Sequence, residues 1–380
     1  MKYPDYDRSS LSITASIGEY FGGRSNYPTL PEIDFELEKG GIEKVIFILC
    51  DGMGDRLLRR HMPADCFLLK HDRAAISPVF PSTTAAATTS IWTGISPLEH
   101  GWLGWSLYFK ECGAQIDAFT GNDGHTGIRF PTGSPAATLM PLPPAMCCQT
   151  QAEAHMVSKF DNYAGPGFVQ HAVKSLDDML TVAGSLANGE GKKIVCLYYN
   201  EPDHTMHETG VNSPETVWHF NDINRRLEAF HKTLRQDTLM IVTADHGLVD
   251  GKNPVMINEI DSIDECLWMP PSVEGRAAAF FVKPFRRAQF EREFKAVCGD
   301  DFLLIDREEA LKTNLFGRGI IHPKSEDCMG DYIACATGER YIRYDTIGGR
   351  IPNMKGMHAG LTDDEMTVPV IIARGEKDVR

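Results

Sequence analysis

The sequence predicts a doubly wound α/β fold, in which a mostly parallel central sheet carries helices on both faces and a smaller layer is inserted. Four apolar, β-branched runs recur along the chain, and three of them lead directly into polar clusters. Helical patterns separate the runs. Continuous rather than alternating apolarity is typical of strands buried on both faces, and strands that alternate with helices form parallel sheets.

The runs define the expected strands. They cover residues 45–50, 194–199, 239–243 and 368–373. Asp51 directly follows the first run, and Asp203 lies shortly after the second. Asp245 and His246 follow the third. Ligands of doubly wound folds bind at the carboxyl ends of the strands, so we expect these side chains to converge there.

The helical patterns lie where this fold requires them. They cover residues 168–186, 213–234 and 286–297. Ser213-Pro214-Glu215 gives the second pattern an N-cap, a proline at the first helical position and an acid in the first turn. A further helix is expected after the apolar segment 74–80, because a hydroxyl-rich turn there leads into residues that run to Gly94.

We expect a single domain over residues 1–380, with two regions that depart from the strand–helix alternation. Residues 104–150 are rich in glycine, proline and small side chains, which predicts a lid-like loop region. Residues 255–345 mix short strand and helix signals, which predicts a smaller insertion.

Composition narrows the class of function. The chain has 38 Lys+Arg against 52 Asp+Glu, a formal net charge of −14, which argues against binding a nucleic acid polymer or an anionic membrane. We see neither a signal-peptide pattern nor an apolar run long enough to span a membrane. The ten cysteines form no Cys-x-x-Cys pair, so we expect reduced thiols and a cytoplasmic location.

Acids and histidines near the expected strand ends form a candidate metal site. They are Asp51, Asp203, His207, Asp245, His246 and His358. Carboxylate oxygen and neutral imidazole nitrogen bind Zn²⁺, Mn²⁺ and Fe²⁺, and two-metal sites need two such groups close together. Spacing alone decides little, since a chain of this composition contains about two acid–histidine pairs four residues apart by chance.

The hydroxyl-rich turn at residues 82–84 is a candidate nucleophile. A hydroxyl at a helix N-terminus can attack, while the backbone N–H groups there receive an anionic oxygen of the substrate. The alternative is an ordinary Ser/Thr N-cap. Taken alone, the segment leaves both interpretations open.

Together, these motifs resemble a known family. In order, they are Asp51-Gly-Met-Gly, Phe80-Pro-Ser-Thr-Thr, Thr93-Gly94, His100-Gly101, Tyr199-Asn-Glu-Pro-Asp203-x-x-x-His207-x-x-Gly210, Thr243-Ala-Asp245-His246-Gly247 and Gly356-Met-His358-Ala-Gly360. The set is similar to the type I phosphodiesterase/nucleotide pyrophosphatase branch of the alkaline phosphatase superfamily, and the similarity covers nearly the whole chain.

The resemblance implies one alkaline-phosphatase-like catalytic domain with two divalent metal ions, zinc in the first place and Mn²⁺ or Fe²⁺ as alternatives. One ion would be held by Asp203, His207 and His358. The other would be held by Asp51, Asp245 and His246, with Thr84 alongside as both ligand and nucleophile. The branch places its nucleophilic threonine three residues after the proline and ten before the glycine of Thr-Gly, and both counts give Thr84.

The chain departs from the family pattern at three places. The turn after the nucleophile is Thr84-Ala85-Ala86-Ala87 instead of Thr-hydrophobic-Pro-Asn. The asparagine that usually holds a phosphoryl oxygen is missing from residues 102–106, and backbone N–H groups or Ser106 could replace it. Ala359 stands where the family has a glycine.

Three aromatic residues follow the nucleophile helix: Trp102, Trp105 and Tyr108. They could stack on a leaving group or pack in the core.

These inferences predict a hydrolase that cleaves a phosphodiester or nucleotide pyrophosphate bond through a covalent phospho-Thr84 intermediate. The expected substrate is a small phosphate ester. The altered turn and the missing asparagine leave a phosphomonoesterase or a phosphonate hydrolase as the alternative. A catalytically silent binding protein is the alternative from a different class. The Cys/Ser-x-Pro-x-Arg context of sulfatases is not found.

Overall fold

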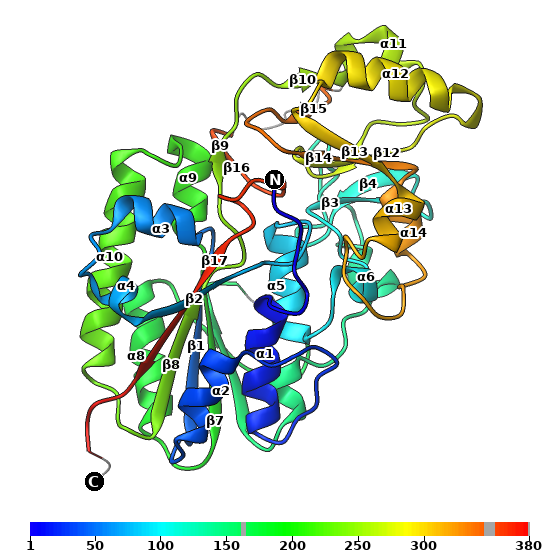
Figure 1. Cartoon of the computed structure of the whole chain (residues 1–380). Coiled ribbons are helices and arrows are strands. Elements are labelled where there is room, and N and C mark those ends of the chain that lie inside the picture. Colours follow the sequence, from blue (N-terminus) through cyan, green and yellow to red (C-terminus); the bar gives the residue numbers. More distant parts are fainter. Residues whose placement is uncertain (161–164, 346–353, 379–380) are drawn as a thin grey trace.

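The computed structural model describes residues 1–160, 165–345 and 354–378, and it contains a seven-stranded main sheet (Figure 1). In spatial order, the strands are β2 (Asp72–Ile76), β17 (Val368–Arg374), β8 (Thr238–Thr243), β1 (Lys44–Cys50), β7 (Lys193–Tyr199), β5 (Glu153–Ser158) and β6 (Val169–Ala172). β1 pairs in parallel with both β7 and β8, whereas β17 is antiparallel to β8 and β2. The expected mostly parallel α/β fold is confirmed.

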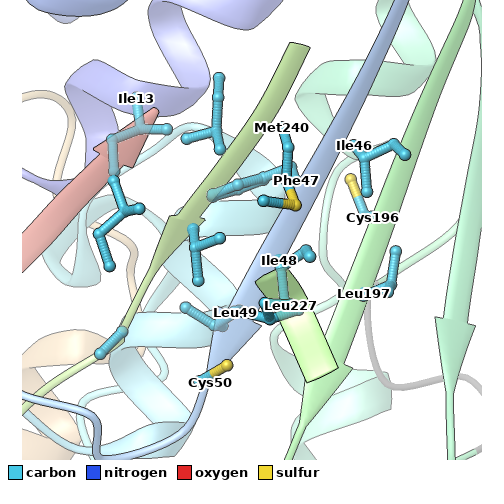
Figure 2. Packing of buried hydrophobic residues seen from close by; sticks show 14 of the residues in the cluster. Ile13, Ile46, Phe47, Ile48, Leu49, Cys50, Cys196, Leu197, Leu227 and Met240 are labelled. Carbon is cyan, nitrogen blue, oxygen red and sulfur yellow. The ribbon is translucent and has the colours of Figure 1, made fainter. Parts of the chain in front are cut away.

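The main sheet lies between two layers of helices, as Figure 1 shows. α1 (Ser10–Tyr20) and α5 (Thr84–Thr93) pack together on one face, and α8 (Leu176–Ala187) and α10 (Pro214–His231) lie on the other. Every residue of β1 and β8 is buried. Figure 2 shows their apolar side chains packed between these layers. Burial on both faces explains why the strands are continuously apolar.

Local signals place most helix boundaries. The Ser213 side chain accepts a hydrogen bond from the Thr216 N–H, so α10 begins at Pro214 as expected, although it ends at His231 and not at residue 234. Gly94 closes α5 in the left-handed conformation with φ +74°. α12 (Arg287–Cys298) matches its prediction within one residue at each end.

The helix expected over residues 168–186 is wrong in its first part. Residues 169–172 form β6, which pairs in parallel with β5. The helix in this region, α8, starts only after Ser175, whose side chain accepts from the Asp178 N–H. Pairing with a neighbouring strand and a strong N-cap together outweigh the helical periodicity of the preceding residues.

A second, six-stranded sheet joins two distant parts of the chain. In spatial order, its strands are β13 (Phe302–Asp306), β14 (Tyr332–Ala336), β12 (Ala277–Phe280), β11 (Ser272–Val273), β3 (Ser106–Phe109) and β4 (Ala114–Asp117). Region 104–150 therefore contributes a β-hairpin in addition to loop. Leu107 and Ile116, paired across this hairpin, are buried in the core that lies under the sheet.

The remaining elements are short. The helices are α2 (Pro31–Glu38), α3 (Asp55–His61), α4 (Phe67–His71), α6 (Pro97–His100), α7 (Ala136–Leu139), α9 (Asp203–Thr209), α11 (Asp261–Asp264), α13 (Arg307–Lys312) and α14 (Ser325–Met329). The strands are β9 (Val249–Asp250), β10 (Val255–Met256), β15 (Ile342–Arg343) and β16 (Gly356–Met357). Among the described residues, no helix has the length and apolarity needed to cross a bilayer.

Candidate active site

The predicted ligands converge at the carboxyl edge of the main sheet. Asp51 directly follows β1, and Asp203 begins α9 shortly after β7. The turn that follows Asp51 depends on Gly52, whose φ is +72°. A Cβ atom at this position would lie 2.9 Å from the Cβ of Asp203 and 3.0 Å from its Cα. Glycine therefore allows the two acidic turns to approach each other.

Asp51, Asp245 and His246 form a fully buried cluster. His246 Nε2 lies 3.4 Å from Asp51 Oδ1 and 3.6 Å from Asp245 Oδ2. Among the described residues, neither of these two oxygens has a hydrogen-bond partner, whereas Asp245 Oδ1 accepts from the N–H groups of Gly52 and His246. Buried polar atoms in proteins are nearly always satisfied, so two unpartnered carboxylate oxygens beside an imidazole nitrogen suit a metal cation.

The electrostatics of this cluster also favour a cation. Burial raises the pKa of Asp51 well above its ordinary value, and the charges of Asp245 and Asp203 raise it further. Burial likewise raises the pKa of Asp245. Buried carboxylates this close repel each other unless a positive charge is shared between them.

A second cluster consists of Asp203, His207 and His358, whose candidate ligand atoms lie within 4.8 Å of one another. Asp203 Oδ2 is 3.2 Å from His207 Nε2, and Asp203 Oδ1 is 4.0 Å from His358 Nε2. Within the described parts of the chain, Asp203 Oδ1 has no hydrogen-bond partner. His207 Nδ1 donates to the Gly356 carbonyl at 2.8 Å. This bond fixes the ring and leaves Nε2 as the ligand atom.

Without a metal, Asp203 and His207 form an ion pair. Burial lowers the pKa of His207, but the neighbouring Asp203 charge outweighs it and raises that pKa to about 9. Burial raises the pKa of Asp203, yet the His207 charge brings it below its ordinary value. The two clusters touch through His358, whose ring stacks on His246 with centroids 4.1 Å apart.

Thr84 lies beside the buried cluster, as the sequence predicts. It is the first residue of α5, and its Oγ1 donates to Asp51 Oδ2 at 3.4 Å and lies 3.3 Å from His246 Nε2. The first N–H groups of a helix have no partner within it, so they can receive an anion next to this hydroxyl. Thr83 differs, because its Oγ1 donates to Glu274 Oε1 at 2.6 Å.

A cavity of about 650 Å³ is lined by Thr84, by Asp51 of the buried cluster and by all three residues of the second cluster. Of the three aromatic candidates, Trp105 lines it. Trp102 is 6% exposed and its Nε1 donates to the Met140 carbonyl at 3.0 Å, which is a core position. Tyr108 packs edge-on against Phe281 at 5.4 Å. Among the described residues, neither of these two nor Ser106 lines this cavity.

Sequence reasoning missed several residues of the cavity wall, among them Lys159, Tyr198 and Glu274. The Tyr198 hydroxyl donates to Asp51 Oδ2. Glu274 Oε1 also accepts from the Trp105 N–H at 2.9 Å, and burial raises the pKa of Glu274 to about 7. Tyr198 lies in a strand that the sequence predicts, so its position could have drawn attention. Glu274 and Lys159 lie in no recognisable motif.

This fold and site define a member of the alkaline phosphatase superfamily. Residues 45–296 match the family described as type I phosphodiesterase/nucleotide pyrophosphatase. The match covers more than half of the chain, so the chain belongs to this family, and membership supports a hydrolase of the phosphodiesterase/pyrophosphatase type.

Solved structures share the fold. An inactive variant of murine ectonucleotide pyrophosphatase/phosphodiesterase 5 in complex with AMP superposes with a TM-score of 0.63 at 15% identity, over 89% of this chain and 91% of that one. Phosphonoacetate hydrolase from Sinorhizobium meliloti 1021 in complex with phosphonoformate gives 0.60 at 16% identity, over 89% and 91%. The comparison with curated proteins finds no match.

Proposed function

We propose that this protein is a two-metal hydrolase that cleaves a phosphodiester or nucleotide pyrophosphate bond through Thr84. One observation carries the proposal. Thr84 Oγ1 lies within hydrogen-bonding distance of Asp51 and His246, at the N-terminus of α5 and at the floor of the cavity. A hydroxyl in this position combines a candidate metal ligand set with unpaired backbone donors.

The proposed metals are zinc, with Mn²⁺ or Fe²⁺ as alternatives. Asp51, Asp245 and His246 would hold one ion, and the second would be held by the cluster of Asp203, His207 and His358. The mixed carboxylate–imidazole donor set and the unpartnered oxygens fit these ions. When bound, such ions lower the pKa of a coordinated hydroxyl and stabilise negative charge on phosphoryl oxygens.

The residues of the chain supply the remaining steps. The Thr84 oxygen attacks phosphorus in line with the leaving alcohol or phosphate, which gives a covalent phospho-Thr84. The N–H groups of the first turn of α5 receive the non-bridging oxygens, a role that the family gives partly to its asparagine. Water then attacks phosphorus from the opposite side and restores the Thr84 hydroxyl.

A phosphonate hydrolase is the second candidate, and Lys159 favours it. Lys159 lines the cavity that contains Thr84, and its positive charge would suit a substrate with a second anionic group, such as a carboxylate. Phosphonoacetate hydrolase, which shares the fold, was solved with phosphonoacetate. Phosphomonoester hydrolysis would use the same residues.

Thr84→Ala tests the proposal. We expect a loss of kcat of at least about a thousandfold with both zinc ions still bound, whereas the neighbour Thr83→Ala loses about tenfold or less. Metal content is measured together with turnover of bis-p-nitrophenyl phosphate, p-nitrophenyl phosphate and phosphonoacetate. Near wild-type turnover in Thr84→Ala would disprove the nucleophile. The preferred compound among the three decides between diesterase, monoesterase and phosphonate hydrolase.

We further propose a cytoplasmic location and a small phosphate ester as the partner. All ten cysteines are free thiols, including the adjacent Cys147 and Cys148, which supports a reducing compartment. Fractionation of the source cells with activity measurement would test the location.

A further inference from the structure

A second cavity of about 200 Å³ adjoins the one that contains Thr84. Trp105, Glu274, Met354 and Met357 line both cavities, so the two share a wall. The second cavity lies against the six-stranded sheet and is lined in part by β11, β12 and β15. A substrate whose phosphorus sits at Thr84 can therefore extend a substituent past Trp105 into this space.

The second cavity contains polar groups that the protein itself leaves unsatisfied. Ser272 is 5% exposed, and its Oγ has no hydrogen-bond partner among the described residues. The same holds for both ring nitrogens of His125, whereas Ser106 Oγ lies beside the Asp117 carboxylate. All three residues line the second cavity, although they come from three separate segments. Since buried polar atoms are nearly always satisfied, this group points to a hydrogen-bonding occupant.

Gly124 makes room for one of these groups. A Cβ atom at position 124 would lie 2.1 Å from Ser106 Oγ. Any other residue would displace the serine hydroxyl from its position beside the cavity. Gly124, in the segment that follows β4, thus leaves the space that the Ser106 hydroxyl needs.

The chemistry of the wall favours an uncharged occupant. Arg343, at one side, has its charge paired with Asp345 through a hydrogen bond of 2.6 Å from Nε to Oδ1. Burial lowers the pKa of His125, so its ring is neutral near pH 7. Glu274, on the shared wall, already accepts hydrogen bonds from Thr83 Oγ1 and the Trp105 N–H. The other unsatisfied side chain is the hydroxyl of Ser272. The cavity of about 200 Å³ has room for a small polar group, such as glycerol or a pentose.

We propose that this cavity binds the polyol part of a phosphodiester substrate, with Ser106, His125 and Ser272 as the residues that determine specificity. The inference rests on the proposed function and deepens it by naming the class of alcohol.

Two chromogenic diesters with the same leaving group test this subsite: glyceryl 4-nitrophenyl phosphate and methyl 4-nitrophenyl phosphate. We expect kcat/KM of the zinc-loaded wild type to be at least about tenfold higher for the glyceryl ester. Ser272→Ala should lower the glyceryl value by about fivefold, the effect of one hydrogen bond, and leave the methyl value within about twofold. His125→Phe and Ser106→Ala should act in the same direction.

Ser10→Ala is the matched control, because Ser10 is a buried serine in α1 whose Oγ likewise has no hydrogen-bond partner. Ser10→Ala should leave kcat/KM unchanged for both the glyceryl and the methyl ester. Since the hydroxyls of Ser272 and Ser10 have no hydrogen-bond partner in the described part of the chain, their removal should leave folding intact. Equal kcat/KM for both esters, or an equal loss in Ser272→Ala for both, would overturn the proposal and leave ordered water as the occupant.

A third substrate, thymidine 5′-(4-nitrophenyl) phosphate, separates the polyol from a nucleoside. If Ser272→Ala impairs this ester more than the glyceryl ester, the polyol assignment is wrong. Calorimetry on zinc-loaded Thr84→Ala protein with glycerol 3-phosphate and methyl phosphate measures the same preference without turnover. A tenfold tighter binding of glycerol 3-phosphate would support the subsite even if neither diester is hydrolysed, and equal affinities would overturn it.

Discussion

The two candidate metal clusters are built from the same kinds of side chain but differ in how the metal-free protein treats their charges. In the buried cluster, the side chains of Asp51, Asp245 and His246 are 3%, 0% and 0% exposed. In the open cluster, those of Asp203, His207 and His358 are 11%, 19% and 10% exposed. The first set lies at the ends of central strands, and the second lies on α9 and after β16, at the wall of the cavity.

This difference has an electrostatic consequence. Asp51 and Asp245 have raised pKa values because burial opposes their charges. Without a bound cation, the charged carboxylates of the buried cluster therefore destabilise the folded protein. Asp203 instead pairs with His207, so the open cluster neutralises itself. Replacing an aspartate by asparagine should therefore change the free energy of unfolding of the metal-free protein in opposite directions in the two clusters. Both variants would nevertheless lose metal.

The largest effect is expected on activity. Asp245→Asn and Asp203→Asn should each lower kcat/KM by at least about a hundredfold, because each removes a proposed ligand. Zinc content should fall from two ions towards one per chain. A variant that keeps two tightly bound ions and its full activity would remove that residue from the ligand set.

In metal-free protein, the two variants should diverge in stability. Asp245→Asn keeps the oxygen that accepts from Gly52 and His246 and removes a buried charge, so the free energy of unfolding should rise by about 1–3 kcal/mol. Asp203→Asn breaks the ion pair with His207 and should lower the free energy of unfolding by about 1–2 kcal/mol. Urea unfolding in EDTA measures both. Changes of the same sign would contradict the distinction between the clusters.

The pH dependence sharpens the same distinction. The pKa of His207 is raised from 6.5 to about 9 in the folded metal-free protein. Its contribution to stability is fully present below pH 6.5 and is lost as the pH rises through 9. The raised pKa values of Asp51 and Asp245 act in the same direction, because their charged forms are disfavoured in the folded state.

We therefore expect the free energy of unfolding in EDTA to fall between pH 6.5 and 9, with a slope from His207 of at most about 1.4 kcal/mol per pH unit. Urea titrations at several pH values give this slope. His207→Gln should flatten it. A slope that persists unchanged in this variant would show that another group titrates there.

The sequence predicts the clusters much better than their surroundings. The ligands follow strands whose apolar runs are visible, so their convergence at one sheet edge follows from topology. Glu274 is different, because its contact with Thr83 joins residues 191 positions apart and involves a strand in an irregular insertion. The sequence does not reveal the second cavity for the same reason. Its wall combines the β3–β4 hairpin with β11 and β12, which are close to the hairpin in the second sheet but distant from it in the sequence.

The smallest expected effect concerns the turn that holds His358. Gly52 provides the positive φ beside the buried cluster, whereas beside the open cluster this conformation is adopted by Ala359, with φ +88°. A non-glycine residue in this region carries strain of about 1–3 kcal/mol. Ala359→Gly relieves the strain but removes a buried methyl, worth about 0.8 kcal/mol, and adds about 0.5–1 kcal/mol of unfolded-state entropy.

The free energy of unfolding of Ala359→Gly should therefore lie between about 1 kcal/mol below and about 2 kcal/mol above that of the wild type. Ala183→Gly is the matched comparison, because Ala183 is equally buried but lies inside α8. Its unfolding free energy should fall by about 2 kcal/mol, since helix propensity and methyl burial are lost with no strain to relieve. Equal losses in both variants would mean that Ala359 is not strained. If Ala359→Gly instead keeps its stability but loses activity, the alanine matters for the orientation of His358, and the open cluster is held as precisely as the buried one.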